Sequence, residues 1–175
     1  MRLLVALGGN AIKQAHEKGT TLEQFLNCKR TATLLAKVVR QMGPEDRLVI
    51  THGNGPQVGN LAVQQDLAKN VVPPQDLDVL GAMTQGQIGY MLQQMLDNQL
   101  RDLDVKRPIV AIVNRVRVNR DDPEFQGENA SKPVGNFLTE DEVKRIKEKH
   151  PEYIFKKVKP GEGRVEAGCS ITRSN

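Results

Sequence analysis

The stretch from Arg47 to Gly59, RLVITHGNGPQVG, decides the fold, because an apolar run leads directly into a glycine-rich turn and a helix start. An apolar run that ends in such a turn is typical of a strand buried on both faces of a parallel sheet. Pro56 suits the first turn of a helix, where a backbone N–H would have no partner. The stretch therefore predicts a strand to Thr51, a turn, and a helix to about Ala68.

The start of the chain repeats this arrangement. The apolar run from Leu3 to Leu7 ends at a Gly-Gly-Asn turn. A helix follows, because Thr20 and Glu23 match a capping box and apolar residues then recur at helical spacing until Gly43. Strand, helix and strand in this order predict two parallel strands joined by a helix.

Two further elements extend the pattern. A long helix is expected from Val79 to about Leu103, and the run from Pro108 to Val113 predicts a third buried strand. Gly86 and Gly89 lie on one face of the long helix and indicate a place where another backbone comes close. The fold class that follows is α/β, with a mainly parallel sheet and helices on both faces.

The character of the sequence changes after Asn114. Basic and apolar residues alternate, a loop follows, and Thr139 with Glu142 forms a second capping box before a charged helix. YIFKKV then predicts a short strand. We expect a small projecting α+β subdomain over residues 116–164.

The composition excludes several classes of protein. The net charge is only +4 and aromatic residues make up 3%, which argues against nucleic-acid binding. No apolar run is long enough to cross a membrane, and the N-terminus lacks a signal-peptide cleavage site. Cys28 and Cys169 form neither a disulfide framework nor a metal-binding spacing, and Cys28 fits a small core residue. We expect a soluble, cytoplasmic protein with no metal site, membrane or nucleic-acid partner.

Both glycine-rich turns lie where a ligand is expected. In open α/β sheets, ligands bind beyond the carboxyl ends of the strands, and backbone N–H groups of such turns can close on an anion. One such turn alone is equally well explained as a tight turn, but two of them after buried strands favour an anion site. Neither is followed by the Gly-Lys-Ser/Thr of a P-loop.

Two side chains have both a structural and a catalytic interpretation. His52 is either a residue that braces its turn, which we favour because no Asp or Ser partner is evident, or a general base. Lys132, in the loop SKPVGNF, is either a solvated residue or a cation held over an anionic substrate, as phosphoryl transfer needs.

Four long strings are specific to one family: VALGGNAI, THGNGPQVGNL, AMTQGQIGYML and SKPVGNFLTEDE. Together with PEYIFKKVKPGEGR, they resemble carbamate kinase, in the amino-acid kinase superfamily, from Leu3 to Arg164. The resemblance implies a three-layer α/β/α sandwich that forms a homodimer. It also implies phosphate transfer between ATP, with Mg²⁺, and carbamate, giving ADP and carbamoyl phosphate. In many organisms the reaction runs towards ATP at the end of arginine fermentation, in the arginine deiminase pathway.

The resemblance also implies roles for individual residues. The phosphoryl-transfer site would be lined by Gly8, Gly9 and Asn10, the carbamate side would be held by Gly53, Asn54 and Gly55, and Lys132 would reach over to the transferred group. Superfamily relatives often carry a lysine on the first strand. This chain has Leu4, Val5 and Ala6 there, as carbamate kinases do, which favours Lys132. Residues 1–115 would be the carbamate-binding lobe.

In the family, the chain continues for almost as much length again and carries the nucleotide pocket there. We therefore expect that this chain lacks the nucleotide-binding lobe and exposes a sheet edge. After GEGR the family typically continues close to WRRVVPSPKP, whereas residues 165–175 read VEAGCSITRSN. A back-translation of VEAGCSIT, shifted by one base, reads Trp-Arg-Arg-Val-Val-Pro-Ser-Pro. We expect these residues to be a frameshift product with loose packing, a hypothesis that the coding DNA tests.

Three functions stay open on these grounds. The first is a carbamate kinase whose truncated chain is inactive alone. The second is a non-catalytic fragment, or a dimerisation partner of a full-length subunit. The third is another acyl-phosphate-forming kinase of the superfamily.

Overall fold

The computed structural model describes residues 1–14, 16–119, 121–123, 137–149, 151, 154–158 and 166–170. The chain divides into two compact units. The first contains Met1–Pro56 and Gly81–Asn114, and the second contains Gln57–Leu80 and Arg115–Asn175.

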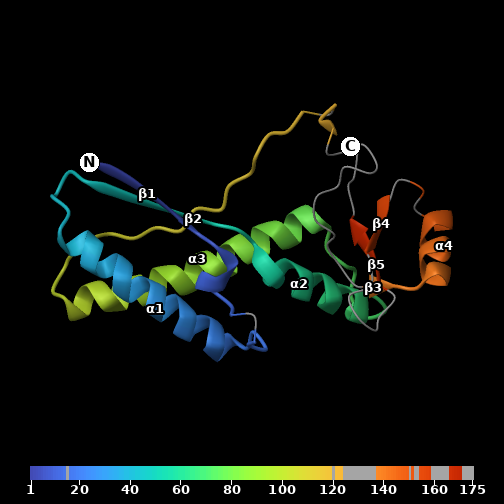
Figure 1. The fold of residues 1–175 in the computed structure, drawn as a ribbon, viewed down its shortest axis with the longest axis horizontal. Coiled ribbons are helices and arrows are strands. Elements are labelled where there is room, and N and C mark those ends of the chain that lie inside the picture. Colours follow the sequence, from blue (N-terminus) through green and yellow to red (C-terminus); the bar gives the residue numbers. More distant parts are fainter. Residues whose placement is uncertain are drawn as a thin grey trace. The chain divides into compact units, whose positions relative to one another are not determined.

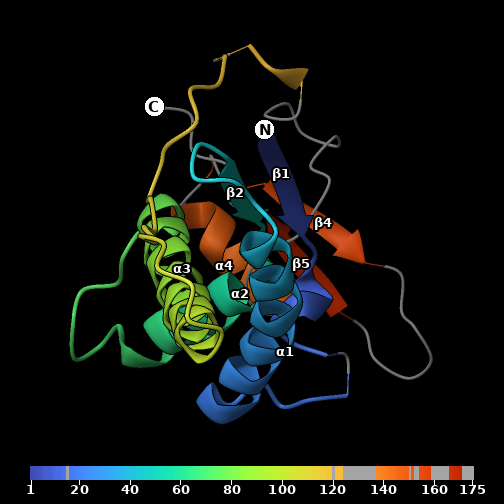
Figure 2. The same cartoon turned by 90° about the vertical axis from the view of Figure 1, so that its left-hand side faces the viewer.

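The first unit is built on two parallel strands, β1 (Arg2–Leu7) and β2 (Arg47–His52). Helix α1 (Thr21–Arg40) connects them, and most of helix α3 (Leu77–Asp102) belongs to the same unit. Both helices lie on one side of the two strands (Figures 1 and 2). The expected strand–helix–strand arrangement is confirmed.

Helix α1 begins as the sequence predicts. The Thr20 hydroxyl accepts a hydrogen bond from the Glu23 N–H at 3.3 Å, and the Glu23 carboxylate accepts one from the Thr20 N–H at 2.8 Å. This reciprocal pair satisfies two donors that the first turn of a helix otherwise leaves open. The capping box is therefore confirmed, and it fixes where the connection between the strands becomes helical.

Two apolar clusters hold the helices to the strands. In the first, residues of α1 and α3 pack together against partly buried residues of the sheet: Ala32, Leu35, Ala36, Val39, Leu96 and Leu100 against Val5, Leu48 and Ile50. In the second, Ile12 packs with Cys28 of α1 and with Ile88, Met91 and Leu92 of α3. The burial of these side chains supplies the main force that holds the unit together.

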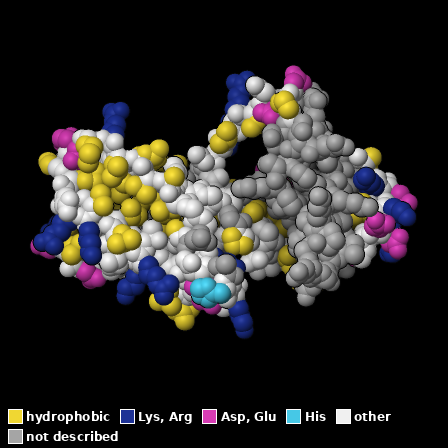
Figure 3. All heavy atoms as spheres, viewed as in Figure 1, with side chains coloured by type: hydrophobic (Ala, Val, Ile, Leu, Met, Phe, Trp, Pro, Cys, Tyr) yellow, Lys and Arg dark blue, Asp and Glu magenta, His cyan; other side chains and the backbone are white. Residues whose placement is uncertain are grey.

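The strands are covered on one face only, which corrects the expectation that both faces are buried. Leu4 of β1 is 66% exposed and Val49 of β2 is 52% exposed, whereas their neighbours Leu3 and Leu48 face the helices and are partly buried. Figure 3 shows hydrophobic side chains gathered over this part of the molecule. Because strand side chains alternate between faces, helices on one side can cover only half of them.

The run from Pro108 to Val113 is not a buried strand, which corrects the third expected strand. It is extended but pairs with no strand among the described residues, and Val110 and Ile112 are 76% and 77% exposed. Two glutamines of α3 hold it in place instead. Gln93 donates to the Ile109 carbonyl at 2.8 Å, and the Gln85 amide exchanges two hydrogen bonds with the backbone of Asn114.

The second unit contains most of helix α2 (Gly55–Ala68), helix α4 (Glu140–Lys149) and strands β3 (Phe137–Leu138), β4 (Ile154–Val158) and β5 (Glu166–Ser170). The strands form an antiparallel sheet in the order β3-β5-β4. The expected capping box at Thr139 and the strand in YIFKKV are confirmed. The loose packing expected of the tail is wrong for residues 166–170, which form the central strand of this sheet.

No helix in the described part of the chain is long and apolar enough to cross a membrane.

Candidate functional site

The two glycine-rich turns leave the sheet side by side. Leu7, the last residue of β1, pairs with His52, the last residue of β2. Adjacent parallel strands lie about 4.8 Å apart, so Gly8 and Gly53, which follow these residues, start from the same edge of the sheet. The expectation that both turns lie at the carboxyl ends of neighbouring strands is confirmed.

The first turn presents two adjacent backbone donors. It continues into a short 3₁₀ helix, η1 (Gly9–Ala11). The Gly8 carbonyl accepts from the Ala11 N–H, and the Gly9 carbonyl accepts from the N–H groups of Ile12 and Lys13, each at 3.0 Å. In a trans peptide the N–H lies opposite the C=O. The N–H groups of Gly9 and Asn10 therefore point away from these carbonyls.

Three glycines of the two turns border open space. No described heavy atom outside the chain neighbours lies within 4 Å of the position that a Cβ would take on Gly8, Gly9 or Gly53. Among the described glycines only Gly19, with a φ of 83°, has the left-handed backbone that favours glycine, and Gly8 has a φ of −76°. Neither a left-handed backbone nor a close described neighbour therefore accounts for Gly8, Gly9 and Gly53.

The second turn is braced by its own side chains. His52 Nδ1 lies 3.2 Å from the Gly53 carbonyl, which agrees with the bracing interpretation of this histidine. The Asn54 amide nitrogen lies 3.5 Å from the position of a Cβ on Gly81 of α3. Helix α2 begins at Gly55, directly after the turn.

Lys132 lies outside the described residues, so the distance from its ammonium group to the two turns is not defined. Its role as the cation over the transferred group stays a prediction.

The sequence reasoning missed three polar residues that hold the segment after the first turn, and a fourth polar residue, Gln24, that is buried on the same helix. Gln24, Asn27 and Thr31 lie on the apolar side of α1, and Glu17 lies in the connection between the turn and the helix. Gln24 and Asn27 are only 6% and 2% exposed. The signal was present in the sequence, because polar side chains interrupt the core-facing positions of an otherwise periodic helix.

Cys28 lies next to these residues and is fully buried, as predicted for a small core residue. Burial raises the pKa of its thiol to about 11, because the apolar surroundings disfavour the thiolate. A neutral, buried thiol is unreactive, so Cys28 serves packing rather than chemistry.

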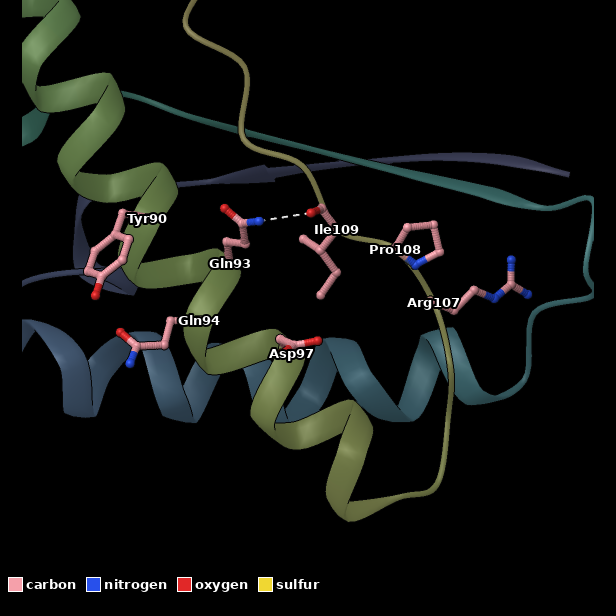
Figure 4. A pocket seen from close by; sticks show the side chains of 7 residues that line it. All are labelled: Tyr90, Gln93, Gln94, Asp97, Arg107, Pro108 and Ile109. Atoms are coloured by element: carbon pink, nitrogen blue, oxygen red, sulfur yellow. Dashed lines mark hydrogen bonds between the residues drawn. The ribbon is translucent and has the colours of Figure 1, made fainter.

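A surface pocket of about 350 Å³ lies elsewhere in the first unit, between α3 and residues 107–109 (Figure 4). Its wall includes Tyr90, Gln94 and Arg107. Arg107 donates to the Met42 carbonyl at 2.9 Å, in the loop that leads into the amino end of β2. The pocket therefore borders the end of the sheet opposite to the two turns, and ligands of open α/β sheets bind at the carboxyl ends.

Comparisons with known proteins show which family this chain resembles. The chain is 49% identical to the carbamate kinase of Thermococcus kodakarensis over 147 residues, which are 83% of this chain and 45% of the relative. It is 44% identical to the carbamate kinase of Pyrococcus furiosus over the same share of both chains. No family model matches the chain.

Solved structures give the same result. A carbamate kinase from Giardia lamblia bound to AMP-PNP matches 97% of this chain and 51% of its own, with a TM-score of 0.85 and 36% identity. A second structure of that enzyme, thiocarbamoylated by disulfiram on a cysteine, matches with a TM-score of 0.83 and 35% identity.

The parallel strands β1 and β2, joined by a helix and ending in paired turns, define a class, that of open α/β proteins. Within it, the chain is homologous to the N-terminal portion of carbamate kinases and shares their amino-acid kinase fold. It spans about half the length of the curated relatives it matches.

Proposed function

We propose that this chain forms the carbamate side of a carbamate kinase. The proposal rests mainly on one observation. Two glycine-rich turns leave paired strand ends, and the Cβ positions of Gly8, Gly9 and Gly53 border open space. Both turns belong to the strings that resemble the family, and the chain is 49% identical to a carbamate kinase over 147 residues.

In the proposed reaction, a carbamate oxygen attacks the γ-phosphorus of ATP. The bond from that phosphorus to the bridging oxygen breaks, ADP leaves with its electron pair, and carbamoyl phosphate forms. Phosphoryl transfer depends mostly on positioning and on neutralising the charge of the transferred group. The backbone donors of Gly9 and Asn10 would face the phosphoryl oxygens, and Gly53, Asn54 and Gly55 would hold carbamate.

Other parts of the proposed machinery lie beyond these turns. Lys132 would supply the cation over the transferred group. Mg²⁺ reaches such sites on the phosphates of the nucleotide, and we assign no described side chain to it. We propose that the nucleotide pocket lies in the half of the family fold that this chain does not span, so that the chain alone does not turn over. A homodimer and a cytoplasmic location in arginine fermentation belong to the same proposal.

Carbamoyl phosphate tests the acceptor side directly. In the ¹⁵N-labelled chain, we expect carbamoyl phosphate to shift the amide resonances of Gly8, Gly9, Asn10 and Gly53, and to leave Gln94, in the pocket of Figure 4, unchanged. Acetyl phosphate serves as the comparison, because stronger binding of acetyl phosphate would favour another acyl-phosphate-forming kinase. Shifts confined to residues far from both turns would contradict the proposed site.

Gly9→Ala sharpens this test. Because the added methyl group meets no described atom of the chain, the fold should be retained while carbamoyl phosphate is excluded. Gly86→Ala is the matched control, since the corresponding position on Gly86 is also open but lies on α3. Equal affinity of both variants for carbamoyl phosphate would count against a ligand at the first turn.

The nucleotide part of the proposal needs a separate assay. Purified chain, carbamoyl phosphate and ADP are mixed, and ATP is measured by coupling to hexokinase. We expect no ATP above background. Steady formation of ATP by the chain alone would show that it contains a complete site.

One observation favours a second candidate function, that of a non-catalytic partner of a full-length subunit. Leu4 and Val49 expose the outer face of a parallel sheet, and parallel sheets are normally covered on both faces. A protein partner would cover this face. Sedimentation of the chain with a full-length carbamate kinase tests this, and Val49→Lys should abolish co-sedimentation if the outer face is the contact.

A further inference from the structure

A buried asparagine lies directly beneath the first glycine-rich turn. Asn27 of α1 is 2% exposed, and its side-chain amide nitrogen donates to the Ile12 carbonyl at 3.3 Å and to the Glu17 carboxylate at 2.6 Å. Its amide oxygen accepts from Arg30 at 3.0 Å. Both N–H groups of the amide are thus used, and both bind the segment that follows the turn.

Ile12 is the link between Asn27 and the turn. Its N–H donates to the Gly9 carbonyl, its own carbonyl accepts from Asn27, and its side chain is 2% exposed in the cluster with Cys28 and Ile88. The Gly9 carbonyl fixes the plane of the peptide that carries the Asn10 N–H. A displacement of Ile12 would therefore turn this donor.

Further contacts hold the same segment. The Glu17 carboxylate that accepts from Asn27 also accepts from the Gln14 N–H at 2.8 Å. Thr31, one turn after Asn27, donates to the Ala11 carbonyl at 3.3 Å. The segment is thus tied to α1 at Ala11 and Ile12, at the carboxyl end of η1, and again at Glu17.

We propose that Asn27, through Glu17 and Ile12, is a positioning residue that sets the direction of the Gly9 and Asn10 backbone donors towards the phosphoryl group. Asn27 touches no ligand in this proposal and acts only through the turn. The part of the proposal that concerns the ligand rests on the proposed function, whereas the part that concerns the turn does not.

Two measurements on the ¹⁵N-labelled chain test the proposal. The first is amide hydrogen exchange at Ala11, Ile12 and Lys13, whose N–H groups bind the carbonyls of Gly8 and Gly9. The second is the dissociation constant of carbamoyl phosphate, read from the Gly9 resonance. For Asn27→Ala we expect exchange at these amides to rise about tenfold and affinity to fall about tenfold, because a buried carbonyl and a carboxylate lose their donor.

Thr33→Ala is the matched control. Thr33 lies on the same helix and donates to Gln99 of α3 at 2.6 Å, so its removal breaks a helix–helix hydrogen bond away from the turn. Exchange at residues 11–13 and affinity should stay at the wild-type values. If Asn27→Ala behaves like Thr33→Ala in both measurements, the proposal is wrong.

Glu17 provides a variant pair outside the core. Glu17→Gln keeps an acceptor for Asn27 and for Gln14, so exchange and affinity should stay near wild type, whereas Glu17→Ala should reproduce Asn27→Ala. Identical behaviour of the two Glu17 variants would overturn the proposed link, even if Asn27→Ala does not fold. If carbamoyl phosphate does not shift the Gly9 amide resonance of the wild-type chain, the proposed function fails. The exchange measurement alone then decides whether Asn27 fixes the conformation of the turn.

Discussion

A methyl group placed on Gly89 of α3 would lie 3.0 Å from the Cβ of Ala111, in the extended segment that follows the helix. This is tighter than nine in ten real contacts of a Cβ atom. At Gly86, three residues earlier, no described atom lies within 4 Å of the same position. The interpretation that another backbone comes close is therefore wrong for Gly86, and at Gly89 the close neighbour is a side-chain Cβ and not a backbone.

The two glycines should respond differently to alanine. Gly86→Ala gains helix propensity without a clash and should stabilise the chain by up to about 1 kcal/mol. At Gly89→Ala the contact with Ala111 offsets this gain, so the free energy of unfolding should stay unchanged or fall. Urea unfolding of both variants measures the difference. A larger gain at Gly89 than at Gly86 would contradict the packing described for this segment.

Asp104 follows the last turn of α3 in a strained backbone conformation, so replacing it with glycine should stabilise the chain. Its φ is 53°, the only positive value among the described residues other than glycine. The Val105 N–H binds the Leu100 carbonyl at 2.8 Å and the Asp104 N–H binds the Arg101 carbonyl at 3.0 Å, which is the Schellman pattern. Asp104→Gly should therefore raise stability by about 0.5–1 kcal/mol. Asp104→Val, the control, should lower the thermal midpoint because a branched side chain tolerates this φ poorly.

The capping box of α1 gives a pH dependence. Hydrogen bonds from the Thr20 backbone and hydroxyl and from the Gly19 backbone lower the pKa of Glu23, although partial desolvation opposes them. The carboxylate therefore stabilises the folded chain at pH values above its ordinary pKa of about 4.3. This contribution is lost as the pH falls through the lower pKa that Glu23 has in the folded state. Thr20→Ala should move the Glu23 pKa back towards the ordinary value and weaken this acid dependence. NMR titration of the Glu23 side chain measures the shift, and an unchanged pKa in the variant would contradict the role of the Thr20 hydroxyl, because alanine keeps the backbone N–H.

Two substitutions in the extended segment after α3 should have different effects, one on aggregation and the other on the stability of the unit. Ile112 is 77% exposed, so Ile112→Lys should change the free energy of unfolding by less than about 0.5 kcal/mol while reducing aggregation. Ile109 packs against the core cluster, so Ile109→Lys should destabilise the unit by more than about 2 kcal/mol. Unfolding curves and light scattering of both variants decide this. Equal destabilisation by the two variants would show that Ile112 is covered in solution.

The elements of the first unit follow from local signals, and these were predictable. Thr20 with Glu23 marks the start of α1, and the glycines at 8 and 53 mark the carboxyl ends of two strands. Each of these signals acts within a few residues, so the sequence alone contains it.

What could not be predicted depends on contacts between distant residues. An apolar run such as Pro108–Val113 has the same sequence pattern whether or not another strand pairs with it. Only the tertiary structure shows that Ile112 is exposed. The side-chain amide nitrogen of Asn27 likewise has no acceptor nearby in sequence, since the Ile12 carbonyl is fifteen residues away. The placement of Lys132 over the turns stays a prediction.

The pairing of Leu7 with His52 has a consequence for folding. The two turns come together only when β1 and β2 pair. This pairing closes a long loop that consists of α1 and its connections, so the two turns are far apart in sequence although they are neighbours in the fold. Neither turn has its partner in the denatured ensemble, so a ligand that bridges both would bind the native chain alone. Saturating carbamoyl phosphate should therefore raise the thermal midpoint by mass action, and variants that loosen α1 should weaken binding in proportion to the native population they remove.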